Sequence, residues 1–205
     1  ILNSDLHIHW AWKYSSTMGS STLRYTPTDC FETFPFPQNL SAEMEAELEK
    51  IGEQYHEYRR ELMLKLQLGL TKTYNQFHNR DLPANLDQTD LTPKETGKKH
   101  RKETVNLLNH LTKTAATCSV AEASSGIFRL RRLHKEMDET VCRAYGWTDI
   151  DLAHDFYEVD YLPENDRTRY TISPNSRKEI LQRLLELNHL IHEKEKSEPQ
   201  KQKPK

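Results

Sequence analysis

Leu23–Pro37 reads Leu-Arg-Tyr-Thr-Pro-Thr-Asp-Cys-Phe-Glu-Thr-Phe-Pro-Phe-Pro, and it divides the chain into two differently built parts. Its three prolines fix φ and push the residues that precede them toward extended geometry. The backbone of this aromatic–proline segment is therefore stiff and unsuited to continuing a helix, while its four aromatic rings require apolar neighbours. We interpret the residues before it as the end of a mixed α/β module and those after it as helical.

The composition of the 205-residue chain bounds its class. Hydrophobic residues make up 35% and charged residues 29%, a balance that suits long, surface-exposed helices. The net charge of −2 gives no global signature of nucleic-acid binding, so any basic site has to be local. The three cysteines lack Cys-x-x-Cys spacing, and neither an apolar run of membrane-spanning length nor a signal-peptide pattern occurs. We expect a cytoplasmic protein with reduced thiols and, because the chain opens at Ile1 without a turn or cap, a piece of a larger protein.

One apolar stripe follows the aromatic–proline segment. Ser41 is placed as an N-cap, and acidic residues follow it closely. Apolar residues then recur at intervals of three or four, which predicts one very long helix from Ser41 to Leu82, on the order of 55 Å in length. The stripe consists of Met44, Leu48, Ile51, Tyr55, Tyr58, Leu62, Leu66, Leu70, Tyr74 and Phe77.

Further helices follow a polar connector. We expect helices from Arg101 to Lys113, from Gly126 to a stop at Gly146, and onward from Ser173-Pro174 to Glu193. The stretch from Thr117 to Gly126 is predicted to be a loop or a short capped helix, and Arg167–Ile172 a short strand. The predicted fold class is mainly α: a helical bundle with one very long helix, preceded by the end of a mixed α/β module and followed by a disordered tail.

Two groups of residues raise the question of metal binding. His7 and His9 would suit metal ligation from one face of a strand, but no Cys, Asp or Glu at matching spacing completes a set, which favours packed or surface histidines. Six acidic residues between Asp151 and Ile172 would suit Mg²⁺ in a nuclease, but no lysine follows them, which favours a solvated or arginine-paired loop. No glycine-rich phosphate turn, Gly-x-Ser-x-Gly, His-Glu-x-x-His or Cys-x-x-Cys occurs, so we predict no catalytic, cofactor or metal site.

Long blocks of the sequence resemble a known family. They are His9–Trp12, Arg24–Pro37, Tyr58–Met63, Gly69–Asn75, Leu130–His134, Met137-Asp138, Ala144–Trp147, Tyr161–Arg167 and Leu184–His189. In this order they are similar to the C-terminal region of large adenine-specific DNA methyltransferases, the single-chain type II enzymes of restriction–modification and phage-defence systems. The resemblance covers nearly the whole chain.

The resemblance implies a division of labour. Residues 1–40 would be the C-terminal end of the target-recognition domain, 41–193 a helical C-terminal domain and 194–205 the disordered tail. In the family, the S-adenosylmethionine-binding turn and the Asn-Pro-Pro-Tyr catalytic motif lie upstream, and neither occurs in this sequence. The chain is thus expected to hold no cofactor and to be inactive alone, while the parent's catalytic domain binds S-adenosylmethionine and methylates the N6 of adenine.

Clusters of basic residues are our candidates for DNA contact. We infer them from the charge of the residues, because the family resemblance assigns no DNA-contacting positions. They are Arg24, Lys98, Lys99, Arg101, Lys102, Arg129, Arg131 and Arg132, of which the last three would crowd a helix start. The alternative for each is a surface or salt-bridge role. Expected partners are double-stranded DNA, the methyltransferase catalytic domain and other defence-system subunits, with no membrane. The rival hypothesis is a structural helical module for protein–protein interaction that makes no direct DNA contact.

Overall fold

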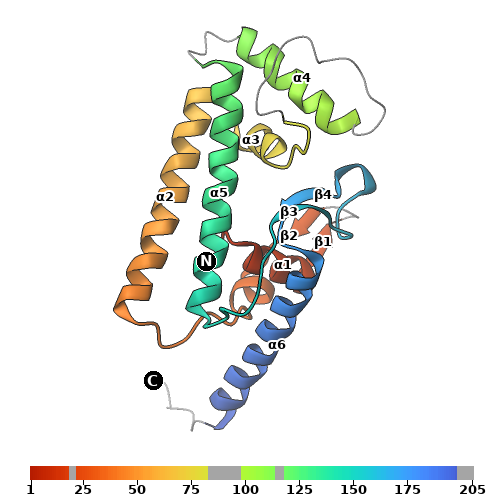
Figure 1. Ribbon diagram of the computed structural model, residues 1–205. Coiled ribbons are helices and arrows are strands. Elements are labelled where there is room, and N and C mark those ends of the chain that lie inside the picture. The colour runs from red at the N-terminus through yellow and green to blue at the C-terminus, as the bar shows by residue number, and fades with distance from the viewer. Residues whose placement is uncertain (19–21, 83–97, 114–117, 198–205) are drawn as a thin grey trace, which may run out of the picture.

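The computed structural model describes residues 1–18, 22–82, 98–113 and 118–197, and its fold is mainly α-helical (Figure 1). The helices are α1 (Asp5–Tyr14), α2 (Ala42–Leu66), α3 (Leu70–Phe77), α4 (Lys98–Lys113), α5 (Val120–Ala144) and α6 (Pro174–Ser197). Two antiparallel hairpins pair β1 (Ser16–Met18) with β2 (Thr22–Arg24), and β3 (Asp155–Glu158) with β4 (Thr168–Thr171). None of the described helices is both long and apolar enough to cross a bilayer.

The predicted helix from Ser41 to Leu82 is in fact two helices. Its start is confirmed, because the Met44 N–H donates to Oγ of Ser41 at 3.2 Å. However, α2 ends at Leu66, where Gln67 adopts a left-handed conformation with φ of 52° and the N–H of Leu68 donates to the carbonyl of Met63. This turn buries Leu68, which a continuous helix would place on the polar face. The apolar spacing is the same on both sides of the turn, so periodicity alone could not show the break.

Helix α5 begins earlier than predicted. Ser119 and Glu122 form a reciprocal capping box, so the helix starts at Val120 and Gly126 lies inside it. The predicted stop is confirmed: Gly146 has φ of 74°, and its N–H and that of Trp147 donate to the carbonyls of Arg143 and Cys142. Arg129, Arg131 and Arg132 therefore do not crowd a helix start.

At Gly126, α2 and α5 approach each other closely. The two helices run side by side in opposite directions (Figure 1). A Cβ built on Gly126 would lie 2.5 Å from Cδ1 of Leu62, and Oη of Tyr58 donates to the Gly126 carbonyl at 3.1 Å. Glycine at this position is thus required by packing between the helices and not by a turn.

Replacing Gly126 by alanine is expected to lower the free energy of unfolding by about 1–3 kcal/mol, because overpacking outweighs the gain in helix propensity. Gly52 in α2 is the matched control, because its Cβ would meet nothing within 4 Å. Gly52→Ala should raise the free energy of unfolding by roughly 0.5–1 kcal/mol. Urea denaturation of both variants measures this, and equal shifts of the same sign would contradict the packing argument.

The N-terminal residues form a helix whose apolar side chains lie in one of the two apolar clusters of the fold. Residues 5–14 form α1 where the sequence suggested a strand, so His7 and His9 do not share a strand face. One apolar cluster joins Leu6 and Trp10 of α1 and Phe34 of the aromatic–proline segment to Ile180 and Leu184 of α6. Apolar contacts in this cluster therefore join residues from both sides of the predicted boundary near residue 40.

A second apolar cluster joins α2, α3 and α4 to the part of α5 between Ala123 and Met137. It contains Tyr55 and Leu66 of α2, Phe77 of α3, Leu107 of α4 and Ile127 of α5. Helix α5 contributes to both clusters, since Val141 near its C-terminal end lies in the cluster that α1 and α6 form. The long helix α5 is therefore the element that links the two halves of the molecule.

The aromatic–proline segment is less extended than predicted. Pro27 opens a π-helical turn that reaches Phe31, a position in which proline is tolerated because its missing N–H is not needed. Phe34 is 3% exposed and anchors the segment as expected, whereas Tyr25 and Phe31 remain 46% and 45% exposed. Phe36 is partly buried against the same apolar cluster, so two of the four rings, Phe34 and Phe36, anchor the segment.

In the C-terminal third of the chain, the predicted strand and the predicted start of the last helix are both present. The predicted strand is present as β4, and β3, which was not predicted, pairs with it. The Ser176 N–H donates to Oγ of Ser173 at 3.1 Å, which confirms the cap of α6. Helix α6 continues to Ser197, four residues beyond the predicted end at Glu193. The predicted connector at 84–97 and the rest of the predicted tail, 198–205, lie outside the described residues.

Candidate functional site

The eight predicted DNA-contacting residues come from three elements. Arg24 is exposed at the end of β2. Lys98, Lys99, Arg101 and Lys102 fall within the first five residues of α4, of which the side chain of Lys102 is exposed. The three predicted arginines lie on α5, where one is buried and two are exposed.

Arg131 is a core residue, so its prediction as a DNA contact is wrong. Its side chain is only 7% exposed. Nε donates to the carbonyl of Phe77 at 2.8 Å, and Nη2 donates to those of Gln76 and Asn79 at 3.0 and 2.8 Å. The guanidinium thereby satisfies carbonyls at the C-terminal end of α3, where the helix dipole favours a cation. Burial lowers the pKa of Arg131 to about 10, and the group stays protonated at neutral pH.

Arg129 and Arg132 point outward and have local partners. Cζ of Arg129 lies 4.5 Å from the centre of the Tyr58 ring. Nε of Arg132 lies 4.0 Å from a carboxylate oxygen of Glu136, one turn further along α5. The groove between α2 and α5 that Arg129 lines also contains Glu61 and Glu122, so its charge is mixed. The nearby acids make the groove between α2 and α5 a poor site for a phosphate group.

A polar groove of about 420 Å³ separates α3 from α4. Its walls carry two lysines, four amide side chains and one acid: Lys72, Lys113, Asn75, Gln76, Asn106, Asn109 and Glu103. Nε2 of Gln76 donates to the Glu103 carbonyl at 2.9 Å, and Nδ2 of Asn79 donates to Oγ1 of Thr104 at 2.8 Å. These bonds fix α4 against α3.

Helix α4 contains the basic run that the sequence analysis selected, and its cations far outnumber its acids. Its sixteen residues carry five cations and a single acid, Glu103, and no acid lies in its first turn. The positive end of the helix dipole coincides with four of the cations, an arrangement that an anion would stabilise. The α4 basic helix and the α3–α4 groove together form the candidate DNA-contacting surface.

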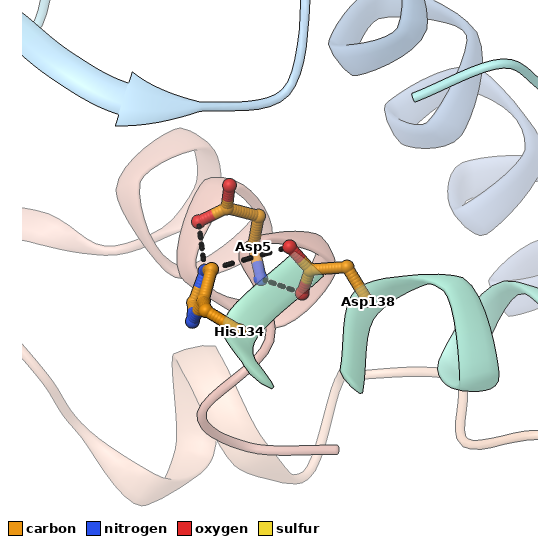
Figure 2. Close-up of side chains that lie close together, drawn as sticks. All are labelled: Asp5, His134 and Asp138. Carbon is orange, nitrogen blue, oxygen red and sulfur yellow. Dashed lines mark hydrogen bonds and ion pairs between the residues drawn. The ribbon is translucent and has the colours of Figure 1, made fainter. Parts of the chain in front are cut away.

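The structure contains a buried polar cluster that was not predicted (Figure 2). Asp5 comes from the first turn of α1, and His134 and Asp138 lie one turn apart on α5. Nε2 of His134 lies 3.2 Å from Oδ1 of Asp5 and 3.4 Å from Oδ2 of Asp138. With exposed fractions of 5%, 3% and 0%, the three side chains do not reach solvent. The cluster therefore joins α1 to α5 from inside the core.

Hydrogen bonds extend this cluster to the rest of the fold. The N–H of Asp5 donates to Oδ1 of Asp138 at 2.8 Å, so Asp138 caps the start of α1. Oδ2 of Asp5 accepts bonds from Oγ1 of Thr171 and the N–H of Ile172 in β4 and the residue after it. Nε2 of His154 lies 2.8 Å from Oδ2 of Asp138. The cluster thus ties α1, α5 and the β3–β4 region together.

The charges of the cluster follow from its geometry. Burial would lower the pKa of His134, but the carboxylates of Asp138 and Asp5 outweigh it and raise the pKa to about 9. Burial would raise the pKa of Asp5, but the charge of His134 and the bonds from His134 and Thr171 hold it well below its usual range. Burial and the charge of Asp5 raise the pKa of Asp138, against the opposing effects of His134 and His154. His134 is therefore a buried cation between two carboxyl groups.

Two carboxylates and one imidazole are a donor set that suits a divalent cation. Each ligand atom, however, already has a hydrogen-bond partner within the described chain, and each of the three residues is buried. The second nitrogen of His134, Nδ1, is the buried atom of the cluster without a partner, and it faces away from both carboxyl groups (Figure 2). The geometry therefore fits a structural ion network better than a metal or catalytic centre.

The structure shows how the two groups of residues that the sequence raised as possible metal ligands are placed in the described part of the chain. His7 and His9 are packed: Nε2 of His7 lies 3.0 Å from Oη of Tyr25, and Nε2 of His9 lies 3.1 Å from Oγ1 of Thr171. Burial lowers the pKa of both histidines to about 4. In the acidic section, Asp166 pairs with Arg169, and none of its acids joins a group of ligand-forming side chains.

Comparison with protein-family models, with curated proteins and with solved structures gives no match at all.

Proposed function

We propose that this chain is a non-catalytic, DNA-engaging part of an S-adenosylmethionine-dependent adenine-N6 DNA methyltransferase of a restriction–modification or phage-defence system. In this proposal it braces the target-recognition region against DNA and the catalytic domain. The phosphate backbone is contacted by the α4 basic helix, which gives affinity and register and not base choice.

The observation that carries the proposal is the charge of α4 together with its placement. Helix α4 carries five cations in its sixteen residues, and Lys113, one of these five, lines a groove whose walls are rich in amide groups. Lysine and arginine neutralise phosphates, and asparagine and glutamine side chains pair with base edges. The choice of parent enzyme in this proposal rests on the long sequence blocks that resemble the methyltransferase family. The buried Arg131 is removed from the list of DNA contacts, and Arg129 and Arg132 become secondary candidates.

Binding to duplex DNA is expected to depend steeply on salt and to weaken when the α4 cations are removed. The test variant replaces Lys98, Lys99, Arg101 and Lys102 together by glutamine. Its slope of log K against log salt should fall by about 0.9 for each phosphate contact that is lost. Fluorescence anisotropy with a labelled duplex at several salt concentrations measures the slope.

A charge-matched control separates a local site from a general effect of net charge. Lys50, Lys135, Lys194 and Lys196 are exposed on α2, α5 and α6, and their joint replacement by glutamine removes the same charge. This control should keep the slope of the unmodified chain. Absence of binding at low salt, or a flat slope, would refute DNA engagement and favour the protein–protein interaction module.

A further inference from the structure

A second cleft that carries basic residues lies between α1 and the start of α6, and none of its lining residues comes from α4. Figure 1 shows where α1, α6 and α4 lie in the fold. The volume of the cleft is about 540 Å³. One wall consists of His9, Trp12 and Lys13 from α1, and another of Pro174, Arg177, Lys178 and Leu181 from the first turns of α6. Asp160 and Tyr161, which follow β3, close the third side.

The charge of this α1–α6 cleft is positive. Lys13, Arg177 and Lys178 face one acid, Asp160, so the lining carries a net charge of +2 with His9 neutral. His9 is neutral because burial lowers its pKa to about 4, and the charge of Arg177 acts in the same direction although Asp5 opposes it. The cleft therefore holds more positive charge than its own acid can neutralise.

Arg177 is the least compensated of these cations. Nη1 of its guanidinium is shielded from solvent and has no hydrogen-bond acceptor within the described chain. Nor does Arg177, Lys13 or Lys178 form an ion pair with any described carboxylate. Arg183 on the same helix is different, because it pairs with both Asp149 and Glu179. A buried donor without an acceptor is unfavourable, and an anionic ligand in the cleft would supply the missing acceptor.

The surroundings of Arg177 suit an anion that carries an aromatic group. The first turn of α6 has no acidic residue, so the helix dipole adds to the positive potential. The rings of Trp12 and Tyr161 stack with their centres 4.6 Å apart and an angle of 16° between their planes. Oη of Tyr161 lies 3.2 Å from Nδ1 of His9, which fixes the orientation of this aromatic wall. Such rings are a surface on which a nucleic-acid base can stack.

We infer that the α1–α6 cleft binds a phosphate group attached to a nucleoside, with Arg177 as the main phosphate contact and Trp12 and Tyr161 as the base-facing wall. The phosphate is either that of a free nucleotide or that of a nucleic-acid strand. This site is separate from the α4 basic helix and adds to the proposed function without depending on it.

The test is isothermal titration of the whole chain with three probes at constant ionic strength: inorganic phosphate, adenosine monophosphate and a short single-stranded oligonucleotide. Arg177→Gln should weaken binding of every probe that the unmodified chain binds by about tenfold or more, because a charged hydrogen bond to phosphate is lost. Lys194→Gln is the matched control, because Lys194 is exposed on the same helix about 25 Å further along at 1.5 Å per residue. It should leave binding unchanged.

The pattern across the probes identifies the source of the phosphate. Tighter binding of adenosine monophosphate than of inorganic phosphate supports a nucleotide, and a further gain with the oligonucleotide supports a strand. Binding that persists when the four α4 cations are replaced separates this cleft from the α4 basic helix. Absence of binding for all three probes, or equal affinity in the unmodified chain and Arg177→Gln, would overturn the inference.

Fold integrity is checked by thermal unfolding without ligand. Because Arg177 lacks a described acceptor, Arg177→Gln is expected to unfold at the same temperature as the unmodified chain or higher. Amide chemical-shift changes on titration should centre on residues 175–178 and on Trp12. Shifts confined to α4 would also overturn the inference.

Discussion

Replacing Asp138 by alanine is expected to lower the free energy of unfolding by about 3–5 kcal/mol, because it breaks a buried ion network by removing one partner. The carboxylate of Asp138 accepts the first N–H of α1 and lies 2.8 Å from Nε2 of His154. Its loss leaves the charge of His134 with one carboxyl neighbour, Asp5, in place of two. Urea denaturation followed by circular dichroism measures the change.

Glu139 is the control for this substitution. It follows Asp138 directly on α5, but its carboxylate lies 3.7 Å from Nζ of Lys135 at the surface. Exposed pairs of this kind contribute about 0–1 kcal/mol, so Glu139→Ala should change stability little. A loss of less than about 1 kcal/mol in Asp138→Ala would mean that the buried network stabilises the fold no more than a surface pair does.

The same network predicts how stability depends on pH. The folded-state pKa of His134, about 9, lies above its unfolded value of 6.5, so its stabilisation is complete below pH 6.5 and is lost as pH rises through 9. His7 and His9 have folded-state values of about 4, so their protonation in the unfolded chain lowers stability as pH falls below 6.5. Stability should therefore be greatest near pH 6.5. Asp138→Ala should flatten the alkaline side of the curve, and an unchanged curve would contradict the assignment.

Replacing Arg131 by methionine is expected to lower the free energy of unfolding by about 3 kcal/mol, because buried carbonyls lose their donors. Methionine keeps the apolar packing of the side chain but leaves the carbonyls of Gln76, Phe77 and Asn79 without the guanidinium. Arg131→Lys should be intermediate, since an ammonium keeps the charge but not the planar fork of donors. Thermal and urea unfolding measure both variants.

Arg132→Met is the neighbouring control and should change stability by about 0.5 kcal/mol or less, because its side chain is exposed. Comparison of Arg131→Met with Arg132→Met also tests the earlier prediction that Arg131 contacts DNA. If Arg131→Met folded with full stability and lost only DNA affinity, the structural role of Arg131 would be wrong and the DNA-contact prediction would be restored.

Local signals in the sequence found most of the helices. The cap at Ser41, the stop at Gly146 and the start at Ser173-Pro174 are set by interactions within a few residues, and all three are present. Two predicted helix boundaries were wrong, because the local sequence there is compatible with more than one structure. Gly126 suggested a helix boundary but permits contact with Leu62, and the spacing across Gln67–Gly69 concealed a turn.

The candidate sites depended more on long-range contacts. The basic run of α4 was visible as sequence, but the α3–α4 groove arises from packing of α3 on α4. His134 and Asp138 share one face of a helix, which the spacing of four residues could have shown. Their partner Asp5 lies 129 residues earlier than His134, and no local pattern connects them.

The sequence by itself determined the helical class, the starts of α2 and α6, the ends of α4 and α5, and the location of the basic run, because these depend on neighbours along the chain. Only the tertiary structure decided which polar residues are buried and which cations lack a partner. It placed Arg131 on the end of α3, enclosed Asp5, His134 and Asp138 in the core, and left Arg177 in a cleft without a described acceptor. Burial and pairing change the charge and the role of such groups, and both depend on residues that are distant in the chain.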